Sequence, residues 1–241
     1  MFDKLKNLFG GNNNKYFFTN PNTDELPTEQ QFAISLGQII GEHNNYFIDS
    51  LEATKDKKMC KDIMKKWWGI TDKLTAHEIL ASRSKDGHRF LYNELVDLFI
   101  ECDGNTANLD KNDPNYEYIV EYFDNVNEVL QMDEGKLWFP DFRKDFLIKC
   151  DAWDIGRMVF VSRTCYTIAY ITEDEAWQYI NYVKDLARKS FTNWHDYAKS
   201  YLLGRALWGG NNYDDFDVFS DVTEFLLEDE DSPWVEHDWL S

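Results

Sequence analysis

The sequence predicts an all-α fold: a single compact multi-helix domain with an acidic, aromatic C-terminal segment packed on it. Apolar side chains recur at intervals of three and four residues along most of the chain, which is the period of an amphipathic helix. Only 5 of the 241 residues are proline and 12 are glycine, fewer than the turns of an all-β fold require. Aromatic residues make up 16% of the chain, and such a chain can bury a core instead of remaining disordered.

We divide the chain into an N-terminal arm (1–27), a helical domain (28–210) and an acidic C-terminal segment (211–241). The arm contains a short amphipathic segment at residues 2–9. We expect it to dock on the protein's own domain, although a membrane-surface anchor is the alternative. No stretch of about eighteen apolar residues occurs, so we expect no membrane span. The four cysteines lack the paired spacing of zinc sites, and we expect reduced thiols in a cytoplasmic protein.

The helical domain begins with one long amphipathic helix predicted from Thr28 to about residue 51. Thr28 and Gln31 have the spacing of a capping box, and apolar positions follow at helical intervals. The lysine-rich stretch 55–66 forms the next predicted helix, which Gly69 ends. Its lysines could contact phosphates, but interspersed acids and the negative charge of the whole protein favour a solvated helix face.

The middle of the chain alternates helix signals with one loop signal. Thr75 and Glu78 repeat the capping-box spacing and predict a helix start, and a further helix is expected through residues 90–99. The stretch 102–115 contains glycine, proline and several Asn and Asp residues, which favour a loop. From Tyr116 the helical period of apolar residues resumes.

Three further helices are predicted after residue 142. The segment 142–170 is rich in β-branched and aromatic residues toward its end, and we favour a buried helix over a strand. Thr172 and Glu175 form a third capping-box pattern at the start of the next helix. Asn193 can cap the last strong helix, which ends at Gly209 and Gly210.

The net charge of the chain indicates which kinds of partner it can bind. The formal net charge is −19, which disfavours binding to nucleic acid phosphates and favours a basic protein partner. Residues 211–241 contain eleven acidic residues and no Lys or Arg, together with several aromatic residues. Solubility is the simpler explanation of these acids. The sharper one is a decoy surface, whose carboxylates and aromatic anchors suit a fast, tight protein interface. The candidate partner-binding residues are Asp214, Asp215, Asp217, Glu228, Asp229, Glu230, Asp231 and Trp234.

A second set of charges interrupts helices that are otherwise apolar: Asp154, Arg157, Arg163 and Arg205. A buried ion is costly unless it is paired, so these residues either form an ion network or face a cleft. We favour a network that holds helices in register, and the alternative is a cleft whose guanidinium groups receive a carboxylate or phosphate. His88 follows Gly87 at a turn or helix start and joins this set, although a bond to a backbone carbonyl would explain it as well.

Several motifs in order along the chain carry a family resemblance. They are Trp68-Gly69-Ile70, Gly87-His88-Arg89, Trp153-Asp154-Ile155-Gly156-Arg157, Tyr170-Ile171-Thr172-Glu173-Asp174-Glu175-Ala176-Trp177, Phe191-Thr192-Asn193-Trp194, Tyr201-Leu202-Leu203-Gly204-Arg205-Ala206-Leu207-Trp208 and Ser232-Pro233-Trp234. The chain thereby resembles the bacterial family called domain of unknown function 1266, most densely from about 150 to 210. The resemblance implies a mainly helical cytoplasmic domain and no particular activity.

Two classes of function remain open at this point. The sequence contains no glycine-rich phosphate loop, GxSxG elbow or HExxH pair, so we predict no catalytic residue, cofactor or metal. This favours a non-catalytic protein-binding module, such as an immunity protein that inhibits a basic toxin domain through its acidic and aromatic surface. The alternative is an enzyme or small-anion-binding protein with a cleft lined by Asp154, Arg157, Arg163 and Arg205.

Overall fold

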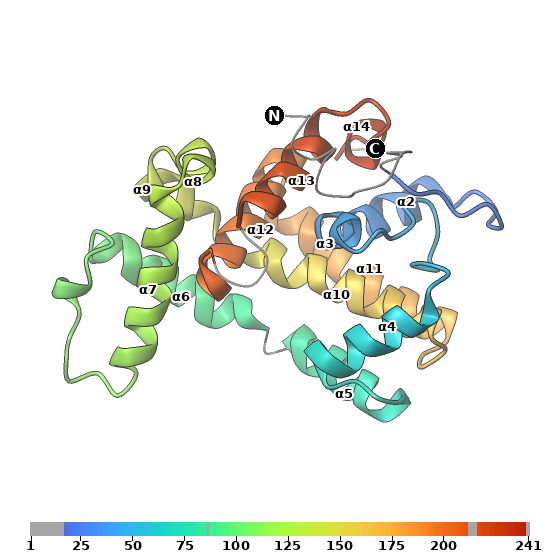
Figure 1. Cartoon of the computed structure of the whole chain (residues 1–241), viewed down its shortest axis with the longest axis horizontal. Coiled ribbons are helices and arrows are strands. Elements are labelled where there is room, and N and C mark those ends of the chain that lie inside the picture. The colour runs from blue at the N-terminus through green and yellow to red at the C-terminus, as the bar shows by residue number, and fades with distance from the viewer. Residues whose placement is uncertain (1–16, 86, 212–215, 240–241) are drawn as a thin grey trace.

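The structure, a computed structural model, describes residues 17–85, 87–211 and 216–239. Within these residues it contains no β-strand, and the one extended pairing is an isolated bridge between Phe18 and Phe47. Helices packed around one continuous core make up the molecule (Figure 1). The prediction of an all-α, single compact domain is therefore confirmed.

The helices are short to medium in length and follow one another closely. In chain order they are α2 (Thr28–Ser35), α3 (Gln38–His43), α4 (Lys57–Ile63), α5 (Lys73–Lys85), α6 (His88–Glu101), α7 (Tyr116–Gln131), α8 (Asp133–Trp138), α9 (Phe142–Asp145), α10 (Asp151–Thr167), α11 (Glu173–Ser190), α12 (Trp194–Gly209), α13 (Phe216–Glu228) and α14 (Pro233–Glu236). A π-helical turn, Met64–Trp68, extends α4, and 3-10 turns lie at Thr106–Asn108 and Phe146–Ile148.

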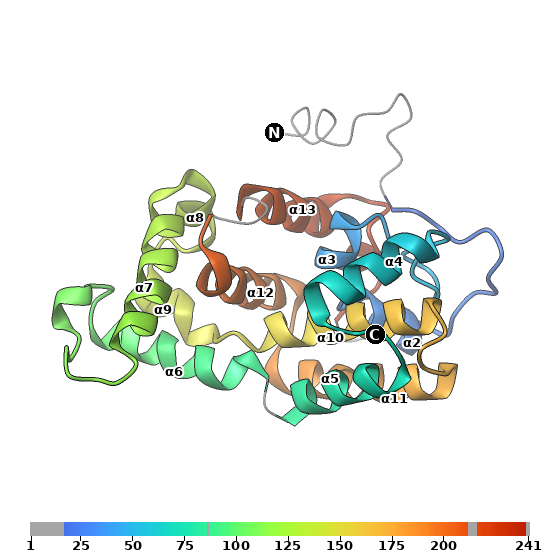
Figure 2. The same cartoon turned by 60° about the horizontal axis from the view of Figure 1, so that its bottom comes forward.

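Helix α10 is the centre of the fold. Every residue from Ala152 to Cys165 is buried, because α10 packs against α11, α12, α3 and α5 on its different sides. Figure 2 shows this helix running through the middle of the molecule, with its neighbours arranged around it. A helix that is apolar on all sides is stable only in such a buried position. The preference for a buried helix over a strand in this segment is therefore confirmed, although the helix begins at Asp151 and α9 forms separately before it.

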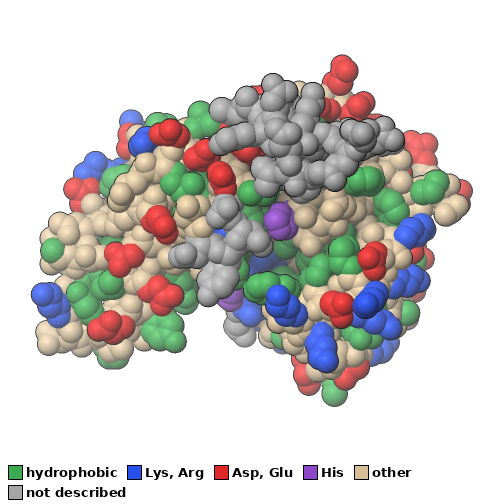
Figure 3. Space-filling view, viewed as in Figure 1, with side chains coloured by type: hydrophobic (Ala, Val, Ile, Leu, Met, Phe, Trp, Pro, Cys, Tyr) green, Lys and Arg blue, Asp and Glu red, His purple; other side chains and the backbone are tan. Residues whose placement is uncertain are grey.

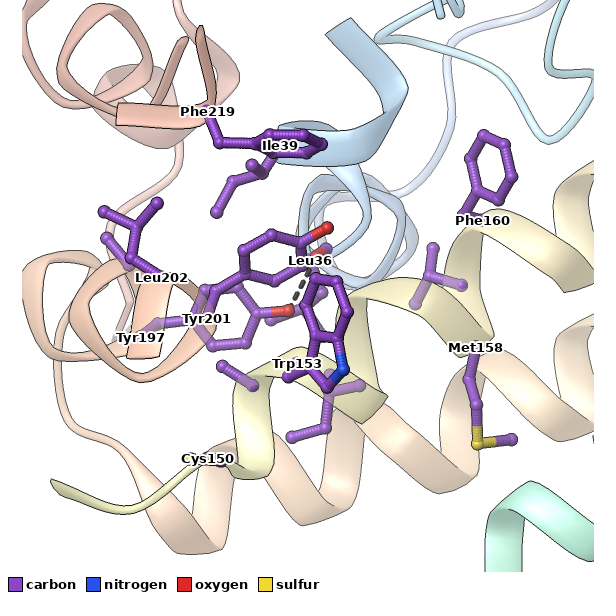
Figure 4. Close-up of a cluster of buried hydrophobic side chains, with 14 of the residues drawn as sticks. Leu36, Ile39, Cys150, Trp153, Met158, Phe160, Tyr197, Tyr201, Leu202 and Phe219 are labelled. Carbon is purple, nitrogen blue, oxygen red and sulfur yellow. Dashed lines mark hydrogen bonds between the residues drawn. The ribbon is translucent and has the colours of Figure 1, made fainter. Parts of the chain in front are cut away.

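The single long helix predicted from residue 28 is wrong, because the chain breaks between α2 and α3. Gly37 lies so close to α10 that an added Cβ would approach Val159 Cγ1 to 2.8 Å. The Tyr197 hydroxyl donates to the Leu36 carbonyl oxygen over 2.6 Å, which the dashed line in Figure 4 marks. This long-range bond provides a hydrogen-bond partner for a carbonyl group at the break. Nothing in the local sequence predicts the bond or the break. The predicted cap at Thr28 also fails, since α2 has no side-chain hydrogen bond at its N-cap, Pro27.

Other helix ends follow their local signals. Thr172 and Glu175 form the predicted reciprocal capping box, and the Asn193 side chain accepts from the Asp196 backbone N–H. Gly69, with a φ of 68°, ends the lysine-rich helix as predicted. The start of α5 is displaced to Lys73, because Asp72 takes the capping position: its carboxylate accepts from the Thr75 backbone N–H over 2.9 Å, and the Thr75 hydroxyl accepts in turn from the Asp72 backbone N–H over 3.1 Å.

The C-terminal segment is part of the core. Helix α13 packs against α3 and α12 (Figure 2), and the side chains of Phe216, Trp234 and Trp239 are buried. The Trp234 ring stacks on Trp194 with centroids 4.7 Å apart. The acidic segment is thus held by its aromatic side chains, as predicted. The amphipathic segment predicted at residues 2–9 lies outside the described residues.

Candidate functional site

A cavity of about 380 Å³ opens between α3, the end of α4, α10 and α12. Figure 3 shows this face hollowed near its centre, with His and Lys or Arg side chains inside the hollow. Its walls carry three arginines and two histidines, Arg83, His88, Arg157, Arg205 and His43. No Asp or Glu is among the described residues that line it. A basic cavity in a chain of net charge −19 points to an anion as its occupant.

Asp154 stands behind the cavity wall and connects α10 to α6. Its Oδ2 accepts from the Arg89 backbone N–H over 2.8 Å, and its Oδ1 accepts from Arg157 Nη2. The carboxylate therefore caps the N-terminus of α6 and pairs with a guanidinium at the same time. Gly87 makes this approach possible, because an added Cβ there would lie 2.1 Å from Asp154 Oδ2.

Arg157 is held by the protein framework along one edge. Its Nε donates to the Trp153 carbonyl oxygen over 3.0 Å, and its guanidinium lies 4.3 Å from the centre of the Trp153 ring. Burial lowers the pKa of Arg157, while the charge of Asp154 opposes that shift. Its Nη1 has no hydrogen-bond partner within the described part of the chain. One terminal nitrogen of a fixed guanidinium therefore remains available to a ligand.

His88 is a neutral hydrogen-bonding group in this cavity. Burial, followed by the positive charges of Arg157 and Arg83, lowers the pKa of His88 to about 4. Its Nδ1 lies 3.3 Å from Arg157 Nη2. Because a guanidinium only donates, Nδ1 accepts, and the ring proton is assigned to Nε2. His88 therefore adds a donor to the cavity wall without adding a charge at neutral pH.

Arg83, on α5, is the residue of the cavity wall that sequence reasoning missed. Its side chain is half-buried, its Nε is buried without a hydrogen-bond partner, and its guanidinium forms no ion pair within the described residues. A buried donor left unsatisfied costs free energy, so a hydrogen-bond acceptor in the cavity would stabilise this group. The available signal was its spacing from Ala76 and Leu80, which places Arg83 on the buried side of the helix.

Arg163 and Arg205 occupy different places. Arg163 does not line this cavity: its Nη2 donates to the carbonyl oxygens of Phe47 and Ser50, the latter over 2.8 Å. Burial lowers the pKa of Arg163 to about 10, and the residue fixes the turn after α3. Arg205 does line the cavity, and its Nη1 donates to the Gly210 carbonyl oxygen over 3.1 Å. Of the residues predicted to form one network or cleft, Arg157, Arg205 and His88 line the same cavity. Asp154 and Arg163, which were predicted to line a cleft with them, do not line this cavity.

Aromatic side chains form most of the remaining wall. Trp153 and Tyr201 lie edge to face with centroids 5.1 Å apart (Figure 4). The Trp153 Nε1–H and the Tyr201 hydroxyl are buried and lack a hydrogen-bond partner among the described residues. Trp67 and Trp208 are much more exposed, at 55% and 37%. The inner wall therefore offers unsatisfied donors, and the outer wall offers ring surfaces.

The candidate partner-binding residues lie on another part of the molecule. Glu228, Glu230 and Asp231 are exposed, and Asp217 and Asp229 are half-buried. Trp234, predicted among them, is only 3% exposed and donates to the Ser35 carbonyl oxygen. Its ring anchors the segment to the domain and is not presented at the surface. Asp214 and Asp215 lie outside the described residues.

Among the described residues, no three His, Cys, Asp or Glu side chains gather in a way that could hold a metal ion. Within the same part of the chain, every helix is too short or too polar to cross a bilayer.

Comparison with known proteins identifies a family. Neither a curated protein nor a solved structure matches the chain. One family model, described as "Protein of unknown function (DUF1266)", matches residues 63–239, well beyond the dense region near 150–210 that the motifs suggested. Motifs that carried the resemblance meet at the cavity, since Trp68, His88, Arg157 and Arg205 all line it. Because the model covers most of its length, the chain belongs to the family of proteins of unknown function DUF1266.

Proposed function

We propose that the protein binds a small organic anion in the cavity between α3, α10 and α12. The observation that carries this proposal is the composition of the wall: three arginines and two histidines, with no acidic residue among the described lining residues. The volume, about 380 Å³, falls within the range of small-molecule sites. An anion held by fixed guanidinium groups in a largely apolar site gains more than it would in water.

The proposal is supported by the charges that the framework leaves uncompensated. Asp154 is shared between Arg157 and Arg89, so it balances one positive charge of two. Arg83 has no acidic partner within the described chain. A structural network would be expected to pair its ions, because unpaired buried charge destabilises the folded state. An anionic ligand between Arg83 and Arg157 removes this imbalance.

A titration of anions tests the proposal. We expect at least one compound from a set of carboxylates, sulfonates and phosphates to bind and to raise the melting temperature. Arg83→Gln should weaken that binding about 10-fold or more, because a charge-assisted hydrogen bond contributes about 1.5–3 kcal/mol. Arg143→Gln is the matched control, since Arg143 is exposed, pairs with Asp103 and lies outside the cavity. Failure of every anion to bind, or equal binding by Arg83→Gln, would contradict the proposal.

As a second proposal, the acidic C-terminal segment contacts a basic protein, such as a toxin domain that the chain would inhibit as an immunity protein. It is supported by the exposed carboxylates of Glu228, the last residue of α13, and of Glu230 and Asp231 directly after it. Deleting the segment would remove core aromatics, so charge reversal of these three residues to lysine is the suitable variant. We expect it to abolish co-purification with the product of a neighbouring gene, and undiminished co-purification would refute this second proposal.

We further propose a cytoplasmic location, which is supported by the state of the cysteines. Cys60, Cys102, Cys150 and Cys165 are free and buried, and burial raises the pKa of each thiol. Reduced, protonated core thiols suit a reducing compartment. Thiol titration of the denatured protein, isolated from its own cells without reductant, should give four free thiols.

A further inference from the structure

We infer that the anion is a phosphate monoester carried on an aromatic or heteroaromatic ring, with a nucleoside monophosphate as the common natural form of this chemistry. The phosphate lies deep in the cavity against Arg83 and Arg157, and the ring lies between tryptophans at the mouth. This inference rests on the proposed function, because it names the class of anion that the same cavity takes.

The depth of each group sets the orientation of the ligand. Arg157 is 8% exposed and Tyr201 is fully buried, whereas Trp67 and Trp208 are 55% and 37% exposed. All four line the same cavity. Arg157 and Tyr201 therefore belong to the floor, the indole rings of Trp67 and Trp208 to the mouth, and the half-buried Arg83 lies between these extremes of exposure. A ligand that matches this order enters with its anionic end first and leaves its ring near the surface.

The charges around the floor favour a dianion over a monoanion. Arg83 and Arg157 line the cavity, Arg89 lies behind its wall, and the one negative charge of this group, on Asp154, pairs with Arg157 and Arg89. The described residues of this group thus keep a surplus of two. A carboxylate would leave half of that surplus uncompensated, whereas a phosphate monoester carries a charge of about −1.5 to −2 at neutral pH. Planar guanidinium groups also match the oxygens of a phosphate in a bidentate manner.

Neutral hydrogen-bond donors in the cavity wall can also bind the oxygens of the phosphate. The Tyr201 hydroxyl and the Trp153 Nε1–H are buried without partners among the described residues, and both residues line the cavity. A terminal phosphate presents three strong acceptor oxygens, more than a carboxylate offers. The donors that the fold leaves unsatisfied are therefore better matched by phosphate.

The mouth of the cavity supplies the ring site. Trp67 lies on the π-helical turn Met64–Trp68, an irregularity that often occurs at functional sites. A base or aryl ring that stacks on a tryptophan gains about 1–3 kcal/mol. Lys65 and Lys66, both exposed, precede this tryptophan, and Figure 3 shows basic side chains gathered beside the hollow. Their positive potential attracts a phosphate-bearing ligand toward the mouth.

A matched set of small probes tests the class of ligand by calorimetry. Phenyl phosphate and its methyl diester share the ring and differ in charge, and benzoate offers a carboxylate on the same ring. At about pH 7.5 a monoester with a second pKa near 6 is mostly a dianion. We expect phenyl phosphate and adenosine monophosphate to bind about 10-fold or more tighter than the diester, benzoate, adenosine and inorganic phosphate.

Trp67→Leu and Arg83→Gln test separately how the cavity recognises the ring and the phosphate of the ligand. Trp67→Leu should weaken phenyl phosphate binding about 5-fold or more, the effect of losing one stacked ring, and leave inorganic phosphate unchanged. Tyr118→Leu is the control, because Tyr118 is 67% exposed and does not line this cavity. Arg83→Gln should reduce the ratio of the affinities for the monoester and the diester. This ratio reports the recognition of charge, because a general loss of folded protein would weaken both compounds equally.

The outcomes distinguish this inference from the proposed function. If benzoate or the diester binds as tightly as phenyl phosphate, and Arg83→Gln weakens all of them, the cavity binds anions and the phosphate inference is wrong. Equal binding of inorganic phosphate and phenyl phosphate would overturn the ring site. Absence of binding by every probe would remove both the inference and the function on which it rests.

Discussion

The junction of α10 and α6 depends on the absence of one side chain. Gly87 leaves the space through which the Asp154 carboxylate reaches the N-terminus of α6, and an added Cβ would lie 2.1 Å from Oδ2 and 2.9 Å from the Arg83 carbonyl oxygen. Its φ of −63° is accessible to any residue, so space and not backbone conformation requires glycine here. The same junction positions His88 and Arg83 on the cavity wall.

Gly87→Ala should therefore destabilise the protein by about 2 kcal/mol, because it overpacks a buried contact and disturbs the cap on α6. Gly41→Ala is the control: its added Cβ would approach only the flexible Gln38 side chain, at 3.4 Å, and alanine is favoured in helices. Urea denaturation measures both variants. An unchanged midpoint for Gly87→Ala would contradict the role given to this glycine.

Arg157→Ala should cost about 3 kcal/mol or more, because a buried carboxylate loses the closer of its two guanidinium partners and keeps only Arg89, at 3.7 Å. Asp154 would keep its bond to the Arg89 backbone N–H, which limits the loss. Arg143→Ala removes an exposed pair with Asp103 and should cost less than about 1 kcal/mol. A melting temperature within a degree of the wild type for Arg157→Ala would show that the buried pair does not stabilise the fold.

Single residues also show where sequence reasoning succeeds. Charges inside apolar helices predicted buried ions, and Asp154, Arg157, Arg163 and Arg205 are all buried. The pattern could not say which of them would meet, because Arg163 bonds to carbonyl oxygens more than 110 residues earlier in the chain. Arg83 was missed because it lies on a helix of mixed polarity, where the only local signal is its spacing from the buried Ala76 and Leu80.

A helix boundary can be predicted from the sequence only when the residues that determine it lie close together in the chain. The start of α11 was predicted correctly because a capping box lies within four residues, Thr172 to Glu175. The break between α2 and α3 was not, since Gly37 meets Val159 and Leu36 meets Tyr197 only after the chain has folded. Spacing alone predicts both Thr28 and Thr172 as capping residues, yet only the Thr172 side chain accepts a capping hydrogen bond.

This pair of threonines makes a matched test. Thr172→Ala should destabilise the protein by about 1 kcal/mol, the usual contribution of a side-chain cap. Thr28→Ala removes no capping bond and should change stability by less than about 0.5 kcal/mol. Equal losses from the two substitutions, measured by chemical denaturation, would mean that the capping box at α11 contributes nothing of its own.

For the whole molecule, two buried groups give stability opposite dependences on pH. Burial is the largest cause that raises the pKa of Glu42 to about 7, against hydrogen bonds from Gln38 and the Phe17 backbone and the charge of Arg163. Its stabilisation is complete below pH 4.5 and is lost as pH rises through 7. The pKa of His88 is lowered from 6.5 to about 4, so its stabilisation is complete above pH 6.5 and is lost as pH falls to 4.

Glu42→Gln should separate the two dependences. The amide stays neutral and can accept the Gln38 hydrogen bond, so the variant loses the Glu42 dependence and keeps that of His88. Between pH 4.5 and 7, its stability relative to wild type should rise steadily with pH, by at most about 3 kcal/mol. Parallel curves for the two proteins across this range would show that Glu42 ionises freely in the folded state.

For the whole molecule, the sequence predicted the class of fold, but it gave a cleft only as the alternative to an ion network and did not predict which residues line it. Periodicity and aromatic content were sufficient for a helical domain with its C-terminal segment packed back, as Trp234 and Trp239 show. The cavity is formed where side chains from α3, α4, α5, α6, α10, α12, α13 and the π-helical turn converge, and neither spacing nor composition encodes that meeting. The acidic whole-protein charge even pointed away from it, because the basic wall residues are few and are scattered along the chain.

A crystal structure of the protein with phenyl phosphate would show directly whether the cavity binds this class of anion. We expect phosphate oxygens within hydrogen-bonding distance of Arg83 and of Arg157 Nη1, with the phenyl ring against Trp67 or Trp208. Arg83 paired with a carboxylate of the protein, in a closed cavity that excludes the compound, would contradict this expectation.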